Sequence, residues 1–384
     1  MVPECWKVRA IKDIAKVTSG GTPSRTIPIY WGGNIPWVRT TEVQNCIIYE
    51  DDVQEFITDE GLRNSSAKLI PANTILLAMI GQGKTRGQTA LLTFEATTNQ
   101  NCAAIICNND QEPEFYFNYL LSQYNNIRNL SNSAGQSNLS GGLVKSIKVP
   151  VPPLPEQKKI ARILSTWDKA IESVEKLIEN SQAQKKALMQ QLLTGKWRLP
   201  GFDGEWEKVE LGKLLDYKQP TPFLVKSTAY SDEYKTPVLT AGKTFVLGHT
   251  NEEFGIYQDN LPVIIFDDFT TASKFVDFSF KAKSSAMKIL TSKEGVSIKY
   301  VFEAMQILSY PVGGHQRHWI SIYSNLVIRL PDIQEQQKIA SVLTSADKEI
   351  ETLQQKLDCL KQEKKSLMQQ LLTGKRRVKV DVNG

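Results

Sequence analysis

The chain has 384 residues, of which 41% are hydrophobic and 9% aromatic, which is enough for two domains of ordinary size plus long helices. Its formal net charge of +5 permits a polyanionic partner but does not establish one. No apolar run approaches the roughly 20 residues of a spanning helix, and the start lacks the apolar core of a secretion signal, so we expect a cytoplasmic protein with no membrane contact.

The five cysteines are scattered and odd in number. Cys102 and Cys107 have no matching pair of Cys or His, so we expect no metal site and reduced thiols.

The first domain is predicted over residues 1–153. It begins near Trp6 and continues through a loop rich in glycine, proline and aromatic residues. Apolar runs bounded by Gly and Asn predict strands at Ile75–Ile80, Ala90–Phe94 and Ala103–Cys107. A helix is expected over Pro113–Tyr124 and a last strand over Val144–Val151.

A long helical segment follows, over residues 154–196, and recurs at residues 332–375. Glu156–Lys196 aligns without a gap to Glu335–Lys375 at an offset of 179 residues, with 21 of 41 positions identical. The chain is therefore a tandem duplication of domain and helix.

Both helical segments carry apolar residues at alternating steps of three and four over more than four heptads, which is typical of a coiled coil. Only Ser181, Lys185 and Lys364 interrupt this seam. A single amphipathic helix packed on its own domain is the simpler alternative. Because the chain order is domain, helix, domain, helix, an antiparallel pair is favoured, with a pseudo-twofold axis and one domain at each end of a rod of roughly 50 Å. The seam residues are Ile160, Leu164, Trp167, Ile171, Val174, Ile178, Leu188 and Leu192, then Ile339, Leu343, Ala346, Ile350, Leu353, Leu357, Leu360, Leu367 and Leu371.

Local signals mark where the helices begin and end. Pro155 suits a first helical turn, and Asp332 followed by Glu335 three residues later resembles a capping box. Gly195 and Gly374 stand where a helix favours a left-handed C-terminal residue.

Residues 197–205 form a linker by composition. The second domain is predicted over residues 206–331, starting at Trp206, and residues 376–384 are a basic tail. Its expected strands and helix are Pro237–Thr240, Val263–Phe266, Ala286–Leu290, helix Lys299–Leu308 and Asn325–Leu330. The fold class is thus α+β, with two mixed α/β domains and two long antiparallel helices.

A phosphate loop is the most tempting catalytic motif, since residues 78–85 read AMIGQGKT and Asp267-Asp268 follows a strand as a Walker B motif would. A coiled-coil ATPase is therefore an alternative. Against it, a phosphate loop must open a helix, and the residues after Thr85 read as turn and strand. The runs after Asn73 and Asn260 also look like the same strand in two domains. No methyltransferase motif, triad or metal cluster is evident, so we assign no catalytic residues.

Polar and basic loops are the other candidate sites, because Arg, Lys, Gln, Asn and His side chains reach phosphates and base edges. They recur at corresponding places in both domains, although each is also consistent with a solvated turn. In the first domain the candidate DNA-binding residues are Gln82, Lys84, Thr85, Arg86, Gln88, Gln136, Ser137 and Asn138. In the second they are Thr270, Thr271, Lys274, His315, Gln316, Arg317 and His318.

Several of these stretches resemble the specificity (S) subunits of type I restriction–modification systems, over the whole chain. The resemblance is carried by Leu154–Ala161 and its repeat Ile333–Ala340, and by Leu188–Gly195 and its repeat Leu367–Gly374. Other stretches are also typical of the family: the tryptophans near the start of each domain, Trp6 and Trp206, and the segments Gly20–Pro23, Tyr30–Trp37 and His315–Trp319.

The resemblance implies two target-recognition domains that each bind half of a bipartite site on double-stranded DNA. The helices would set the spacer and dock two copies of a methyltransferase (M) subunit, and restriction (R) subunits would join the complex in defence against foreign DNA. S-adenosylmethionine for adenine methylation and ATP would belong to these partners, with no cofactor on this chain. A DNA-binding adaptor of another complex is the nearest alternative.

Overall fold

The computed structural model describes residues 3–81, 83–133, 138–240, 242, 244–309 and 318–380. The chain divides into two compact units, which are treated separately below. Unit 1 comprises Met1–Val174 with Lys356–Gly384, and unit 2 comprises Glu175–Gln355. In the described part of the chain, no helix combines the length and the apolar character that crossing a membrane requires.

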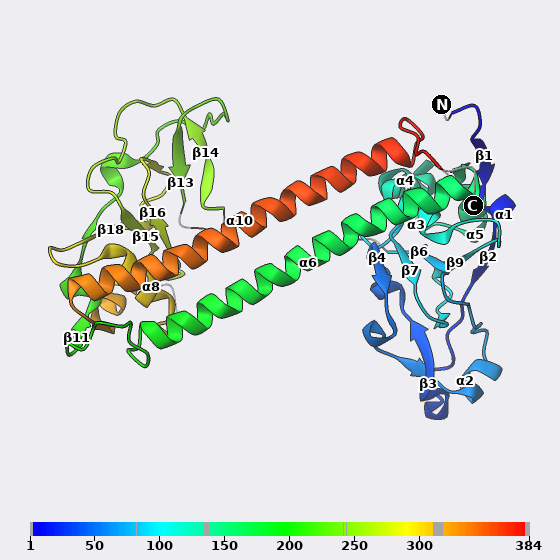
Figure 1. The fold of residues 1–384 in the computed structure, drawn as a ribbon, viewed down its shortest axis with the longest axis horizontal. Helices are drawn as coiled ribbons and strands as arrows, with labels where there is room; N and C mark the ends of the chain where they lie inside the picture. Colours follow the sequence, from blue (N-terminus) through cyan, green and yellow to red (C-terminus); the bar gives the residue numbers. More distant parts are fainter. Residues whose placement is uncertain are drawn as a thin grey trace. The chain divides into compact units, whose positions relative to one another are not determined.

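Unit 1 is built around a five-stranded sheet in the order β2 (Ala15–Ser19), β9 (Cys102–Cys107), β6 (Ile75–Ala78), β7 (Thr89–Leu92) and β4 (Cys46–Ile48) (Figure 1). Two smaller sheets accompany it: β1 (Lys7–Ala10) with β10 (Lys148–Val151), and β5 (Phe56–Ile57), β3 (Trp31–Val38) and β8 (Thr97–Thr98). The helices are α1 (Ile11–Ile14), α2 (Asp59–Arg63), α3 (Pro113–Ser122), α4 (Tyr124–Ser133) and α5 (Gly141–Ser146).

Unit 2 repeats this plan with a four-stranded sheet in the order β12 (Leu215–Lys218), β18 (Met287–Ser292), β15 (Val263–Asp267) and β16 (Ser273–Val276). β11 (Glu207–Glu210) pairs with β19 (Val327–Leu330), and β14 (Val246–Thr250), β13 (Thr236–Leu239) and β17 (Lys281–Ala282) form a third sheet. The helices are α7 (Leu211–Leu214), α8 (Ile298–Gln306) and α9 (His318–Ser321).

The same strand plan in both units confirms that the duplication extends to the domains, whose sequences hardly match. β6 lies between β9 and β7, as β15 lies between β18 and β16. Asn73 and Asn260, just before these two strands, both have left-handed φ values, of 62° and 56°. Asn tolerates this conformation better than most residues, so the same turn leads into the same strand.

The two long helices are α6 (Leu154–Leu192) and α10 (Ile333–Leu371). Their antiparallel pairing is confirmed within each unit: Lys364 on α10 binds Asp168 on α6 in unit 1, and Lys185 on α6 binds Asp347 on α10 at 2.5 Å in unit 2. Both lysines interrupt the apolar seam, and both reach an aspartate at the matching position of the repeat. The interruptions are thus specific ion pairs between the helices.

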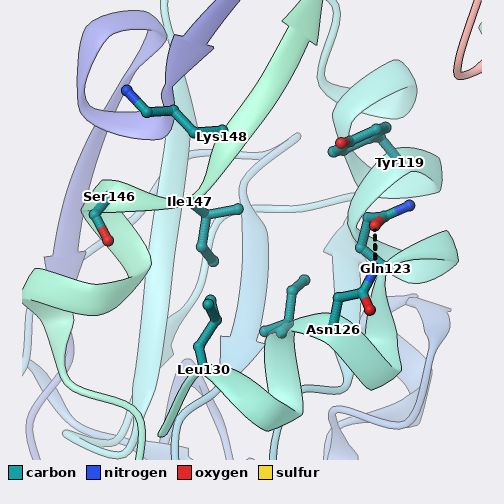
Figure 2. A pocket seen from close by; sticks show the side chains of 8 residues that line it. Tyr119, Gln123, Asn126, Leu130, Ser146, Ile147 and Lys148 are labelled. Atoms are coloured by element: carbon teal, nitrogen blue, oxygen red, sulfur yellow. Dashed lines mark hydrogen bonds between the residues drawn. The ribbon is translucent and has the colours of Figure 1, made fainter. Parts of the chain in front are cut away.

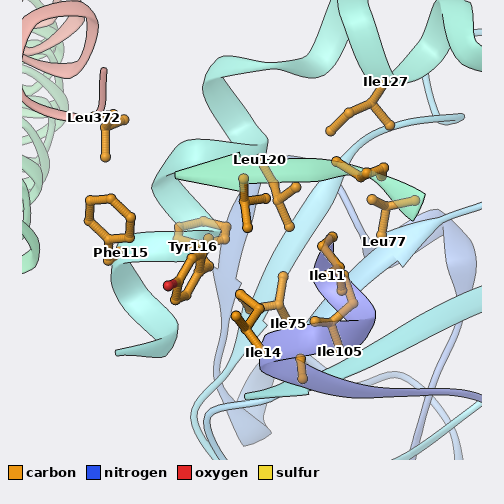
Figure 3. Close-up of a cluster of buried hydrophobic side chains, with 14 of the residues drawn as sticks. Ile11, Ile14, Ile75, Leu77, Ile105, Phe115, Tyr116, Leu120, Ile127 and Leu372 are labelled. Atoms are coloured by element: carbon orange, nitrogen blue, oxygen red, sulfur yellow. The ribbon is translucent and has the colours of Figure 1, made fainter. Parts of the chain in front are cut away.

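Each helix pair is seated on a domain core. In unit 1 the buried cluster joins Ile75 and Phe115 of the domain to Ile160 of α6 and Leu372 just beyond α10, part of which Figure 3 shows. In unit 2 the corresponding cluster includes Leu192 and Ile339. The seam therefore buries apolar surface against the domain as well as against the partner helix.

The helix ends follow the predicted signals with one correction. Gly195 and Gly374 have φ values of 69° and 73°, and the Oδ1 atom of Asp332 accepts the N–H of Glu335 at 2.9 Å. The prediction of a complete capping box is wrong, because the carboxylate of Glu335 does not bind the backbone N–H of Asp332 but binds Arg198 and Trp206 instead.

The strand predicted over Val144–Val151 is half wrong. The hydroxyl of Ser140 accepts the N–H of Leu143 at 3.2 Å and starts the short helix α5, and β10 begins only at Lys148. Helix α4 was not predicted, because its sequence is largely polar.

Candidate nucleic-acid interface

The loop between β6 and β7 carries the predicted first-domain residues and forms a tight hairpin. The N–H of Gly87 donates to the carbonyl of Ala78 at 2.9 Å, and the N–H of Gln88 donates to that of Thr85 at 3.0 Å. Lys84 is exposed, while Thr85, Arg86 and Gln88 are half-buried. The next element is strand β7, so the helix that a phosphate loop requires is missing at this position.

Side chains of helix α4 hold this loop through two hydrogen bonds to its backbone. The hydroxyl of Tyr124 donates to the carbonyl of Lys84 at 2.6 Å, and Arg128 donates to the carbonyl of Arg86 at 3.2 Å. A Cβ atom on Gly87 would lie 3.3 Å from the backbone of Arg128, so glycine permits this close contact. The backbone of the loop is therefore fixed by helix α4.

The described end of the second predicted loop of the first domain lies beside the first loop. The N–H of Leu139 donates to the carbonyl of Met79 at 2.8 Å, which places the exposed Asn138 next to the start of the β6–β7 loop. Gln82, Gln136 and Ser137 lie outside the described residues.

In the second domain, Thr270 and Thr271 form the turn between β15 and β16. The carboxylate of Asp267 accepts the N–H of Phe269 at 2.9 Å and the hydroxyl of Thr270 at 2.7 Å, and Thr271 has a φ of 59°. The hydroxyl of Thr270 therefore shapes the turn. Lys274, on β16, is exposed.

The loop predicted around His315 falls largely outside the described residues, which include neither His315 nor Gln316 nor Arg317, nor the side chain of His318. The segment that follows is fixed, because the N–H of Trp319 donates to Asp268 at 2.9 Å and the Nζ atom of Lys288 lies 3.5 Å from the same carboxylate. Asp268 thus has a structural partner at the end of β15.

Sequence reasoning missed the buried glutamates where each domain meets the helices. Glu156 accepts the indole N–H of Trp6 at 3.3 Å and the Nε–H of Arg377 at 2.7 Å. The repeat unit has the same arrangement: Glu335 accepts the indole N–H of Trp206 at 2.9 Å and binds Arg198 through two bonds of 2.7 Å. Arg198 and Arg377 are separated by the same 179 residues as Glu156 and Glu335, and each glutamate binds the arginine of the other repeat, so no short spacing marks the pair.

The surface of unit 1 also carries an apolar cleft of about 270 Å³ between α3, α4 and β10 (Figure 2). Its lining includes Tyr119, Ile127, Leu130 and Ile147, and burial raises the pKa of the Tyr119 hydroxyl. Gln123, Asn126, Ser146 and Lys148 also line the cleft, but its surface is mainly apolar and does not suit a polyanion.

The geometry defines a class of protein in which two related domains, with different loops, are mounted on matching antiparallel helix pairs. The sequence model of the type I restriction modification DNA specificity domain matches residues 3–180 and 203–362. The chain therefore belongs to this family.

Relatives and solved structures agree. The chain is 54% identical over 138 residues to the EcoR124I/EcoR124II specificity subunit of Escherichia coli, a match covering 35% of this chain and 34% of that protein. It is 34% identical over 193 residues to the MjaIX specificity subunit of Methanocaldococcus jannaschii, covering 49% and 43%. These two matches span less than half of either relative. The putative MjaX specificity subunit of the same organism is 27% identical over 98% of this chain and 95% of its own length.

Among solved structures, a type I restriction–modification S subunit from M. genitalium has the same fold, with a TM-score of 0.68 at 16% identity, covering 97% of this chain and 96% of its own.

Proposed function

We propose that the chain is the DNA specificity subunit of a type I restriction–modification complex, in which each domain binds one half of a bipartite site on double-stranded DNA. The observation that carries this proposal is the contrast between the helix–domain junctions, which are equivalent in the two repeats, and the loops, which differ. Two domains of one fold are joined to helix pairs that are related by the repeat, with Glu156 and Glu335 in the same bonds, yet the loops of the two domains differ. Different loops on domains that are joined to the helices in the same way would contact two different half-sites.

The helices would serve a second purpose, the docking of partners. Because the repeated segments share 21 of 41 residues, they offer equivalent surfaces to two identical methyltransferase subunits. Restriction subunits would join the same assembly. On this proposal the chain itself is not catalytic and acts in the cytoplasm, while S-adenosylmethionine and ATP are bound by the partners.

The direct experiment is to map methylated adenines in cells that express this chain with its cognate methyltransferase subunit, beside cells lacking the chain. The proposal predicts one new bipartite motif, methylated on both strands. Absence of new methylation while the two proteins co-purify would contradict it and favour an adaptor of another complex.

The coiled-coil ATPase is tested separately. The strand that follows Thr85 disfavours ATP turnover by the pure chain. Turnover that is present in the wild type and lost in Lys84→Ala would restore that alternative.

A further inference from the structure

A polar groove of about 320 Å³ lies on unit 1 between the edge strand β2 and helix α5, beside the start of the β6–β7 loop. It collects residues that are far apart in the sequence and that the polar-loop analysis did not single out, apart from its glycine. Its lining comprises Val17, Thr18, Ser19, Met79, Gln100, Ala103, Gly141 and Lys145.

The polar side chains of this groove carry hydrogen-bond donors. Thr18 and Ser19 carry hydroxyls, of which that of Thr18 donates to the carbonyl of Ser19 at a long 3.4 Å. Lys145 carries an exposed ammonium group with no carboxylate at ion-pair distance in the part of the chain that is described. The hydroxyl of Thr22 donates to Oε1 of Gln100 at 2.7 Å. Oε1 is therefore engaged by Thr22, and the Nε2 group of the same amide is the donor. Phosphate oxygens only accept hydrogen bonds, so this lining fits a phosphodiester.

Two further features favour close approach of a backbone. Lys68 lies at the rim, with Nζ 3.4 Å from the hydroxyl of Thr18, and adds a second positive charge. A Cβ atom on Gly141 would meet nothing within 4 Å, so the chain there faces open space.

Three other grooves of the molecule are less suited to a polyanion. The wide groove near β4 is lined by Glu42 and Asp52 together with Arg39, which is paired with Glu42 at 2.9 Å. A groove of the second domain is lined by Glu233, Glu252 and Glu253, which outnumber its Lys235. Carboxylates repel phosphate. The cleft in Figure 2 is largely apolar, although Lys148 lies at its edge.

We propose that the groove between β2 and α5 holds the sugar–phosphate backbone of duplex DNA at the half-site bound by the first domain, with Lys145 as its main charged contact. The groove positions the domain on the duplex, and base edges are read by the neighbouring loops. This inference rests on the proposed function and assigns it a site.

The test uses the complex of the full chain with its methyltransferase subunit, with binding measured by fluorescence anisotropy between about 50 and 200 mM salt. The probes are a duplex carrying the mapped motif and a scrambled duplex. Lys145→Ala should weaken binding severalfold and nearly equally for both duplexes, and should reduce the slope of log K against log salt by about 0.9. Gln100→Ala should weaken both duplexes without changing the slope, because the amide is uncharged.

Lys148→Ala is the matched control, since this lysine lies in the same domain at the apolar cleft and should leave the slope unchanged. An unchanged slope in Lys145→Ala, or a loss confined to the motif duplex with a new methylation motif, would overturn the assignment. If the wild-type complex neither binds the duplex nor methylates a bipartite motif, the proposed function itself fails.

Discussion

The two lysines that interrupt the helix seam occupy equivalent positions, yet the structure predicts different costs for the same substitution. In unit 1, Lys364 binds Asp168, whose side chain is 38% exposed. In unit 2, Lys185 binds Asp347 at 2.5 Å and also lies 3.2 Å from Glu303, whose side chain is fully buried. The perturbation we propose is replacement of each lysine by methionine, which keeps the length and removes the charge.

The magnitudes follow from what each lysine leaves behind. Lys364→Met leaves a half-exposed aspartate that water can solvate, so the loss should be about 0–1 kcal/mol. Lys185→Met leaves the buried carboxylate of Glu303 with Lys299, at 2.7 Å, as its one remaining cation among the described residues. Breaking a buried pair costs about 3–5 kcal/mol, and because one partner remains we expect about 2 kcal/mol.

The structural reason for the difference lies in the domain helices. Gln157 accepts the N–H of Glu112 before α3, and Gln336 accepts the N–H of Ser297 before α8, both at 2.9 Å. The two helices therefore correspond, and the position of Glu303 is occupied in unit 1 by the neutral, buried Asn118. Among the residues that the structure describes, only unit 2 places a buried charge against the seam lysine.

Urea unfolding followed by circular dichroism measures the loss, and hydrogen exchange of α3 and α8 locates it in one unit. The double variant Lys185→Met/Glu303→Gln should recover most of the stability lost in Lys185→Met, because no buried charge is then left without its partner. Equal losses for the two single variants, or no recovery in the double variant, would refute the reasoning.

Three further predictions concern the spacer, the helix ends and pH. Insertion of one four-residue turn after Val174 and another after Gln355 should lengthen the unread spacer by about 6 Å, or one to two base pairs, and leave both half-sites unchanged. An unchanged spacer on methylation mapping would contradict the idea that the helices set the spacer length. Thermal melting should show a larger loss for Gly374→Ala than for Gly195→Ala, because the added Cβ would lie 2.5 Å from a proline ring at the first position and 3.5 Å from an indole at the second; equal losses would contradict this reasoning. Burial raises the pKa of Glu252, but backbone N–H groups and a buried lysine outweigh it and lower that pKa below 4.5. The stability advantage of the wild type over Glu252→Gln should therefore be full above about pH 5 and disappear as the pH falls through the lowered pKa, and an advantage independent of pH in urea unfolding would argue against this ion pair.

The sequence predicted the features that repeat or that depend on local signals. The duplicated helices follow from periodicity and from recurrence at an offset of 179 residues. Their antiparallel pairing follows from the chain order, and the matching strands from the similar runs after Asn73 and Asn260. The run Val144–Val151 was predicted as one strand because valine and isoleucine favour strands. The cap provided by Ser140 overrode that preference.

Features that depend on distant residues could not be predicted in this way. Glu156 is held by Arg377, 221 residues away, and the groove of unit 1 brings together Thr18 on β2, Gln100 just before β9 and Lys145 on helix α5. Nothing in the local sequence of any of these residues marks its partner. The loop after β6 was recognisable because glycine and polar residues cluster in it, and the turn after β15 because two threonines closely follow two aspartates.

The central claim is that each domain reads its own half of one site. The measurement that tests it most directly is adenine-methylation mapping of a chimera in which residues 206–331 are replaced by the corresponding domain of another family member, expressed with the same methyltransferase subunit. The account predicts that one half of the motif changes while the other half and the spacer are retained. A change in both halves, or in neither while the complex stays active, would contradict it.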